Sequence, residues 1–248
     1  YVQMGNQRRS YPSQIEGMAK LHDGIIGKPL MSRCWYKGAR ASIGKGKKIA
    51  VPDHLDYNLW TGPVPEKDYL DNLAPYNWHW RWHWGGGELL NNGIHALDLS
   101  RWGLGVNYPT RVTCLGNRYH HDDDQETPDT SVAQYDFGDA GATWEGSSCH
   151  PRKNDPLPFV AFYGDGGSMH CDAVGGYQVW DFNGKVVENV KGVRSDVPHF
   201  TNLADCVRYG GHLNSEIGEA QMSTLWCHLG NIAYRTGHTL NIDPTTGK

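Results

Sequence analysis

Short stretches rich in β-branched and aromatic residues follow one another between residues 110 and 190, and they constrain the fold more than any other feature. They read RVTCLGNRY, DTSVAQYDF, GATWEGSS, FVAFYGDGGSMHCD and YQVWDFNGKVV. Turn sequences such as FGDAG, YGDGG and FNGK lie at the spacing of β-hairpins. Because hairpins join antiparallel neighbours, this part of the chain predicts a large, mainly antiparallel sheet.

Helical periodicity flanks the strand-rich part on both sides. Segments with apolar residues three or four positions apart are residues 13–22, 88–102, 199–209 and 215–235. The last of them has Ser215 as its expected N-cap and Gly237 as its stop. These elements define an α+β fold, in which helices cover one face of an open sheet. Since the chain offers no second layer for the other face, we expect an oligomer.

A long segment, residues 37–75, separates the first predicted strand from an aromatic run. It is rich in Gly, Pro, Lys and Asp, and long ordered loops of this kind tend to cover a site or a partner surface. The run YNWHWRWHW (residues 76–84) follows it, and if this run is extended its tryptophans share one side. Two interpretations stay open: a wall that stacks on sugars, and packing under the long loop.

Charge and hydropathy exclude several kinds of partner. Lys and Arg total 23 against 27 Asp and Glu, a net charge of -4, so we expect neither nucleic acid nor an anionic membrane surface as a partner. No stretch approaches the ~20 apolar residues that span a bilayer, and no leader is visible. The compartment stays open between a cytoplasmic and an exported location. The start at Tyr1, inside an apolar run, indicates a fragment or a processed form.

The run HHDDDQETPD (residues 120–129) combines imidazoles with carboxylates, which are metal ligands. A charged run between two strands is more typical of a solvated loop, so no metal site is predicted. The six cysteines are scattered without CxxC pairs. We interpret them mostly as small buried apolar residues.

His95 is the first candidate for chemistry. Asn91 precedes it by four residues and Asp98 follows it by three, so the three side chains should project from one side of a single helix. The glycines at 85–87 allow another molecule to approach the start of this helix closely. Imidazole can exchange a proton with a hydroxyl group near neutral pH. The spacing alone leaves open a general acid/base and a hydrogen-bonded structural histidine.

Several segments together resemble one family. The run GGGELLNNGIHALDLSRWGLG is similar to the GGGxLxDxGxHxxD helix of the Gfo/Idh/MocA oxidoreductases. VQMGNQRRS resembles the strand and turn in which the cofactor domain of that family ends, and GMAKLHDGIIGKPL resembles the helix and turn that follow. HFTNLADCVRYG and CHLGNIAYRTGHTLNID are similar to the closing elements of a bacterial subgroup. The resemblance spans nearly the whole chain.

The resemblance implies a division of the chain into two parts. Residues 1–10 would be the terminal strand and turn of a nucleotide-binding Rossmann domain otherwise missing from the sequence. Residues 11–248 would be the substrate-binding and oligomerisation domain, of the dihydrodipicolinate-reductase-like type. Its sheet would form a homodimer or homotetramer. The full-length parent would use NAD or NADP, but tight binding to this chain is not expected, because the glycine-rich turn and the E-K-P lysine would precede Tyr1. The run GKGKK (residues 44–48) follows no suitable strand and is interpreted as a solvated loop.

The resemblance also assigns roles. His95 would be the general acid/base on the reacting hydroxyl of a sugar, a cyclitol or a sugar derivative. The family's helix aspartate falls on Asn91, which can hydrogen-bond a substrate hydroxyl or the ring of His95 but cannot ionise. We expect His83 and Trp84, next to the glycines, to line the substrate site. Arg8 resembles a family position near the substrate or the cofactor, and a surface salt bridge is its alternative.

The leading hypothesis is the substrate-binding part of an NAD(P)-dependent sugar dehydrogenase or reductase, inactive without a cofactor domain. One alternative in the same family is redox-assisted, NAD-dependent cleavage of glycosides. Another is a cofactor-free carbohydrate-binding or scaffolding protein. The substrate, the direction of reaction and the choice between NAD and NADP stay open.

Overall fold

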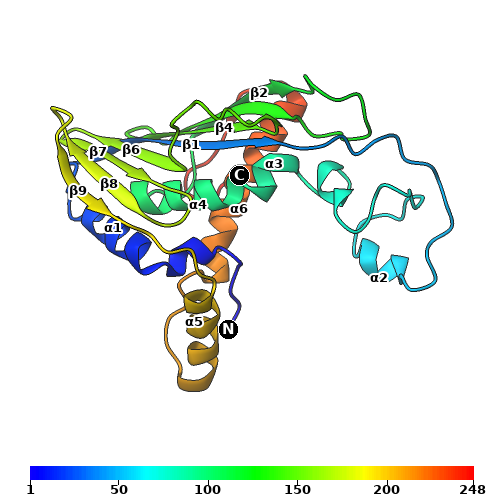
Figure 1. The fold of residues 1–248 in the computed structure, drawn as a ribbon, viewed down its shortest axis with the longest axis horizontal. Coiled ribbons are helices and arrows are strands. Elements are labelled where there is room, and N and C mark those ends of the chain that lie inside the picture. The colour runs from blue at the N-terminus through cyan, green and yellow to red at the C-terminus, as the bar shows by residue number, and fades with distance from the viewer.

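The computed structural model describes residues 1–248 and is built on one ten-stranded sheet (Figure 1). The strands run in the order β10-β2-β3-β4-β1-β6-β7-β8-β9, with β5 paired to β1. Their bounds are β1 (Pro29–Ala39), β2 (Arg111–Asn117), β3 (Thr130–Asp136), β4 (Gly141–Ser147), β5 (Cys149–His150), β6 (Val160–Gly164), β7 (Gly167–Cys171), β8 (Tyr177–Asp181), β9 (Val186–Val190) and β10 (Leu240–Asn241).

Helices α1, α4 and α6 pack along the same face of the sheet, and α5 extends away from it beside the N-terminus (Figure 1). The α-helices are α1 (Pro12–His22), α2 (Tyr57–Thr61), α3 (Gly87–Asn91), α4 (Gly93–Leu104), α5 (Val197–Tyr209) and α6 (Ile217–Thr236). Two 3-10 helices, η1 (Gln7–Ser10) and η2 (Asn77–Trp80), complete the set. None of the helices has the length and apolar character needed to cross a membrane. The predicted α+β class is confirmed.

The predicted antiparallel pairing holds for every strand pair except one. β1 pairs with β4 in parallel, from Met31 opposite Gly141 to Lys37 opposite Ser147, and it pairs antiparallel with β6 on its other side. A strand from the start of the chain therefore occupies the middle of the sheet. Hairpin turns report only local pairing, so they do not predict this long-range insertion.

The core lies between the sheet and the helices. In β2, β3 and β4 alternate side chains are buried, which is the period of two that a sheet with one covered face requires. Tyr135 stacks on Trp226 of α6 with ring centroids 5.4 Å apart, and its hydroxyl donates to the carbonyl oxygen of Trp226 at 3.0 Å. On the opposite face Leu115 and Val132 are exposed and lie directly opposite one another.

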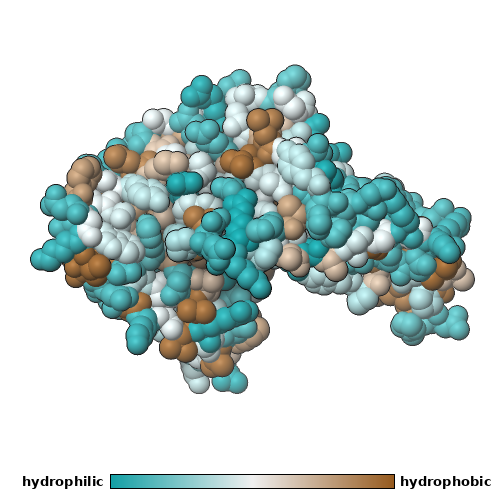
Figure 2. Space-filling view, turned by 45° about the horizontal axis from the view of Figure 1, so that its top comes forward, coloured by the Kyte–Doolittle hydropathy of each residue, from teal (hydrophilic) through white to brown (hydrophobic).

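Residues 40–84 form a lobe that projects from the sheet, on the right in Figures 1 and 2. The lobe has its own small core of Tyr57, Tyr69 and Leu73, against which Trp60 and Trp84 pack. It is held to the β2–β3 connection by hydrogen bonds, for example from the Gly46 N–H to a carboxylate oxygen of Asp124 at 2.7 Å. The long segment is thus an ordered substructure with a helical turn of its own.

Local structure differs from the sequence-based expectation in three places. The predicted helix over 88–102 is interrupted at Asn92, between α3 and α4. Residues 1–10 contain a single β-bridge, at Gln3, and the turn of η1 where a strand is expected. Glu216, not Ser215, caps α6, because its side chain accepts a hydrogen bond from the Gly218 N–H at 2.7 Å.

Candidate functional site

A pocket of about 320 Å³ lies where η1, β1, the start of α4 and the loop before β6 meet. Its apolar wall is made of Trp35, Leu157, Pro158 and Phe159. Polar groups enter from the other lining residues, which include Arg8, Tyr36, Lys37, Asn92 and Asp172. An apolar wall with a few convergent polar groups is the usual composition of a small-molecule site.

Arg8 reaches this pocket from η1. Its guanidinium lies over the ring of Phe159, 4.3 Å from the centroid, and Nη2 donates to the carbonyl oxygen of Ala173 at 3.3 Å. Its buried Nε has no hydrogen-bond partner. Arg8 forms no ion pair, and burial lowers the pKa of its guanidinium. The charge therefore remains available to a ligand.

His95 lies in the first turn of α4 and is half-buried. Its Nδ1 is buried and makes no hydrogen bond. Burial first, and then the nearby charge of Arg8, lower the pKa of the ring to about 4. The imidazole is thus neutral at pH 7, with a free nitrogen that can accept a proton and readily release it.

The two asparagines before His95 play different parts. Asn91 Nδ2 donates to a carboxylate oxygen of Glu88 at 3.2 Å and makes no hydrogen bond to the ring of His95. Asn92 also donates to Glu88, and it is Asn92 that lines the pocket with Arg8. Glu88 is buried and paired with Arg40 at 3.2 Å. The sequence analysis did not select Asn92. The signal that could have found it is the pair of adjacent asparagines, Asn91 and Asn92, at the point where the helix breaks.

Asp98 points away from the pocket and into the protein. Its two carboxylate oxygens accept hydrogen bonds from Arg9 at 2.8 Å each, and one of them also accepts from the Ser223 hydroxyl at 2.7 Å. The pair locks η1 against α4. Since Arg8 is the neighbour of Arg9 in η1, this buried ion pair positions Arg8 relative to His95.

His83 and Trp84 lie in the lobe. The ring of His83 hydrogen-bonds the carbonyl oxygen of Pro65, and Trp84 packs on Trp60 with ring centroids 5.6 Å apart. Neither residue lines the pocket that Arg8 and Asn92 share. The aromatic run begins with the helical turn η2, so its tryptophans do not alternate as they would in a strand. Trp80 is buried, whereas Trp78 keeps 38% of its surface exposed.

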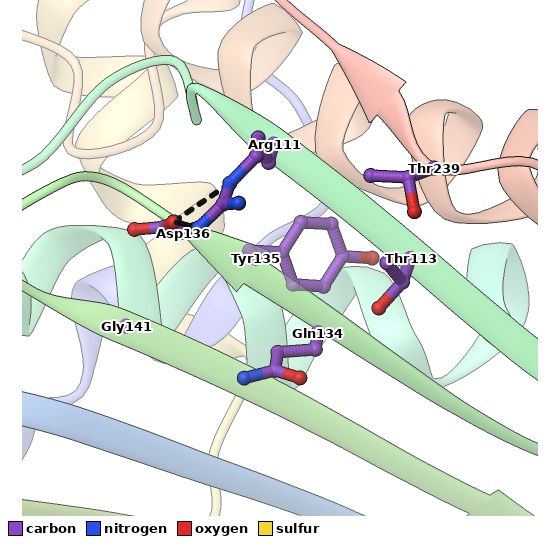
Figure 3. Close-up of a pocket in the computed structure, with 7 residues that line it drawn as sticks. All are labelled: Arg111, Thr113, Gln134, Tyr135, Asp136, Gly141 and Thr239. Atoms are coloured by element: carbon purple, nitrogen blue, oxygen red, sulfur yellow. Dashed lines mark hydrogen bonds and ion pairs between the residues drawn. The ribbon is translucent and has the colours of Figure 1, made fainter.

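A second pocket, of about 310 Å³, lies on the open face of the sheet and is lined by Arg111, Thr113, Gln134, Tyr135, Asp136, Gly141 and Thr239 (Figure 3). Arg111 and Asp136 pair at 2.6 Å and neutralise one another. No histidine, cysteine or unpaired carboxylate lines the pocket. It therefore lacks the groups that acid/base chemistry needs.

The charged run at residues 120–129 is solvated only in part: Asp122 is exposed, whereas Asp123 and Asp129 are not. The Asp123 side chain is 1% exposed and pairs with Arg118 at 2.7 Å. Burial alone would raise the pKa of this carboxyl, but the hydrogen bonds from Arg118 and from the Ile43 N–H hold it at about 2. No group of three or more His, Cys, Asp or Glu side chains is arranged to hold a metal ion. The run anchors the lobe to the sheet.

Solved structures of oxidoreductases share this fold. The aldose-aldose oxidoreductase of Caulobacter crescentus, complexed with glycerol, superposes with a TM-score of 0.69 at 14% identity, over 97% of this chain and 64% of that one. The WlbA dehydrogenase of Bordetella pertussis, in complex with NADH and UDP-GlcNAcA, gives 0.64 at 16% identity, over 98% and 63%. An oxidoreductase of Agrobacterium radiobacter, in complex with NAD+, L-tartaric acid and magnesium, gives 0.60 at 15% identity, over 96% and 64%.

At this level of identity the likeness is one of fold, and the chain spans less than two thirds of the length of these structures. Residues 60–170 match the family model described as GFO/IDH/MocA C-terminal domain. Over these residues the match confirms the resemblance to a Gfo/Idh/MocA C-terminal domain that the motifs indicate. No curated protein matches the sequence.

Proposed function

We propose that the chain is the substrate-binding part of an NAD(P)-dependent oxidoreductase that acts on a sugar, a cyclitol or a sugar derivative. The observation that carries this proposal is the state of His95: its Nδ1 has no hydrogen-bond partner, and its pKa is lowered by burial and by the charge of Arg8. Arg8 in turn lines a pocket together with Asn92. The kinds of ligand named for the similar structures, glycerol and UDP-GlcNAcA, support a hydroxylated substrate.

In the oxidative direction the substrate loses a proton from its hydroxyl oxygen and a hydride from the carbon that bears it. His95 takes the proton on a ring nitrogen, and the oxygen–hydrogen electron pair becomes the second bond of the carbonyl group. In the reductive direction the same nitrogen returns the proton. NAD(P), when bound in the full-length parent, supplies or receives the hydride.

The residues of this chain do not form a phosphate cradle for the cofactor. The only run that suggests one, residues 44–48, already uses the Gly46 N–H and the Gly44 carbonyl oxygen to bind Asp124. The chain spans less than two thirds of the similar structures that hold NAD+ or NADH, which supports a division of the parent into a nucleotide-binding domain, joined near residues 1–10, and a substrate domain at residues 11–248.

The remaining predicted site residues are assigned by their positions. Arg8 and Asn92 hold the substrate against the apolar wall of the pocket, and Arg8 also disfavours the protonated form of His95. Asn91 contacts the substrate or orients the helix break through Glu88. His83 and Trp84 bind a part of the substrate that reaches the lobe.

The test is the change His95→Ala in the full-length parent. General acid/base catalysis typically contributes a factor of about 10² to 10⁴, so kcat with a sugar substrate should fall by at least about 100-fold. The far-ultraviolet circular dichroism and the NAD affinity should not change. The matched control is His238→Ala, which removes an exposed histidine of the final loop.

If the His95→Ala variant keeps its activity, His95 has a structural role and is not the general acid/base. Release of an aglycone with no net change in NADH would assign redox-assisted glycoside cleavage instead. Sugar binding by the chain with no activity in any longer parent would assign a carbohydrate-binding or scaffolding protein.

A further inference from the structure

The lobe contains a pocket of its own, of about 520 Å³, lined by Trp60, Thr61, Gly62, Pro63, Val64, Trp78 and Trp84. It shares no lining residue with the pocket that Arg8 and Asn92 line. Two of its lining residues, Trp60 and Trp84, pack against the small core of Tyr57, Tyr69 and Leu73, which is separate from the main core. The volume lies within the range of ~300 to 1,000 Å³ that is usual for small-molecule sites.

Three indole rings define the chemistry of this lobe pocket. Trp60 and Trp84 meet at a tilt of 58°, with centroids 5.6 Å apart, and Trp78 is 38% exposed beside them. Flat aromatic faces with a polar edge suit a ligand that presents C–H groups on one face and hydroxyl groups around its rim. Pyranose rings have this shape.

Two hydrogen-bonding groups of the lobe pocket lack partners. The indole Nε1 of Trp84 is buried without an acceptor. The hydroxyl of Thr61, a residue only 6% exposed, also has no partner within 3.5 Å, although it lies close enough to the Tyr57 hydroxyl to lower the pKa of Tyr57 against the effect of burial. A buried polar group left unpaired costs about 1 to 3 kcal/mol, so a ligand that pairs with it gains that amount.

The lining contains no charged side chain. A phosphate or carboxylate would therefore lie in this pocket without a counter-charge, which is unfavourable. An acyl chain or an apolar side chain would leave the Trp84 N–H and the Thr61 hydroxyl unpaired. A neutral, hydroxylated ring satisfies all three conditions.

We infer that the lobe pocket is a second carbohydrate subsite, which binds a neutral pyranose unit by stacking on Trp78 and Trp60 and by hydrogen bonds to Trp84 and Thr61. The inference rests on the proposed function only for the class of ligand, and it does not involve His95. The substrate would then be larger than a monosaccharide, with the reacting ring in one pocket and a further unit on the lobe.

The experiment is isothermal titration of the 248-residue chain with cellobiose and maltose as neutral probes and with glucuronate as a charged one. Trp78→Ala should weaken binding of the disaccharide roughly three- to tenfold, the loss expected of one aromatic stacking contact. Thr61→Val, which keeps the shape and removes the hydroxyl, should weaken it less. The control Trp180→Ala removes a tryptophan of β8, far from the lobe in sequence, and should leave the affinity unchanged.

His95→Ala separates this inference from the proposed function, because it should leave disaccharide binding intact even where it abolishes turnover. Equal affinities for the chain and its Trp78→Ala variant, absence of binding by either disaccharide, or preference for glucuronate would overturn the subsite. So would a dimer that Trp78→Ala dissociates, because the pocket would then receive a second copy of the chain. Because Trp78 is partly exposed, its variant should keep the circular dichroism of the chain.

Discussion

The carboxylate of Asp98 joins two segments that lie 89 residues apart in sequence. It is 2% exposed, and its partner Arg9 is 9% exposed. Removing one member of such a pair leaves a buried charge uncompensated, which typically costs about 3 to 5 kcal/mol. We therefore expect Asp98→Ala to lower the free energy of unfolding by about that amount, as measured by urea denaturation.

The matched control for this change is Ser223→Ala, which removes one neutral donor to the same carboxylate and should cost about 1 kcal/mol. If Asp98→Ala also costs no more than about 1 kcal/mol, the ion pair of Arg9 and Asp98 does not hold η1 against α4. This ion pair would then not position Arg8 relative to His95 either.

His95 gives the protein an acid-sensitive step. Its ring has a pKa of about 4 in the folded chain, below the ordinary value of 6.5, because of burial and the charge of Arg8. Between pH 6.5 and 4 the unfolded chain binds a proton that the folded chain does not, so stability falls as the pH falls through this window. Each pKa unit is worth about 1.4 kcal/mol.

The free energy of unfolding should fall between pH 7 and pH 4.5 in the unchanged chain, and it should fall by about 2 kcal/mol less in the His95→Gln variant. Urea denaturation at each pH measures both changes. The control His238→Gln changes an exposed imidazole and should follow the unchanged chain. Parallel pH profiles for all three proteins would show that His95 is solvated in the folded state.

At the residue scale the sequence predicted the candidate site residues better than it predicted which residues they contact. His95 and Arg8 were selected from motifs, and the structure places them close enough for the charge of Arg8 to lower the pKa of His95. Spacing could not show that Asp98 turns inward, because a buried arginine from a distant segment decides its direction. Lys37 and Asp172 carry no motif and enter the pocket only through the pairing of strands.

At the scale of elements, the contact between α4 and the sheet depends on a glycine. A methyl group added at Gly103 would lie 2.3 Å from Cζ of Phe162 in β6 and 2.8 Å from Leu21 of α1. The backbone there is helical, so alanine would be favoured by about 1 kcal/mol on propensity alone. Overpacking of this kind usually costs about 1 to 3 kcal/mol, and clashes this short belong at the upper end.

We expect Gly103→Ala to lower the free energy of unfolding by about 1 to 2 kcal/mol, the balance of these two effects. The neighbouring Gly105→Ala tests backbone strain without crowding, since its φ is +66° and open space surrounds it. A stabilised Gly103→Ala protein would mean that α4 does not lie as close to β6 and α1 as the structure has it. Thermal unfolding followed by circular dichroism measures all of these changes.

Elements whose cause is local were predicted closely. The strands β2, β3 and β4 follow the alternation of their own sequences, and α1, α5 and α6 have their C-caps at Asp23, Gly210 and Gly237, as their sequences suggest. The break at Asn92 was missed, because Glu88 draws both asparagine side chains back toward α3. The small core of the lobe and its anchorage were also missed, since the anchorage depends on Asp123 and Asp124 from a distant loop.

At the scale of the whole molecule, the face of the sheet opposite the helices has no cover within the chain. Leu115 is 78% exposed and Val132 is 48% exposed, and the two lie opposite one another on β2 and β3. Beside them lie the uncharged Thr113 and Gln134, which are also exposed. Exposed apolar pairs on a flat sheet mark an interaction surface, and a two-fold axis lets one surface cover its own copy. We therefore propose that two or four copies associate through this face.

Charging this face should separate the copies without unfolding them. Sedimentation equilibrium at micromolar concentration should give a dimer or tetramer for the unchanged chain and a monomer for the double change Leu115→Lys and Val132→Lys, because four lysines of a dimer would meet on one interface. The control Val187→Lys charges an exposed position on β9, at the edge of the sheet, and should leave the mass unchanged. If the unchanged chain is a monomer, this face does not hold copies of the chain together. If the Val187→Lys control also dissociates, the interface lies at the edge of the sheet instead.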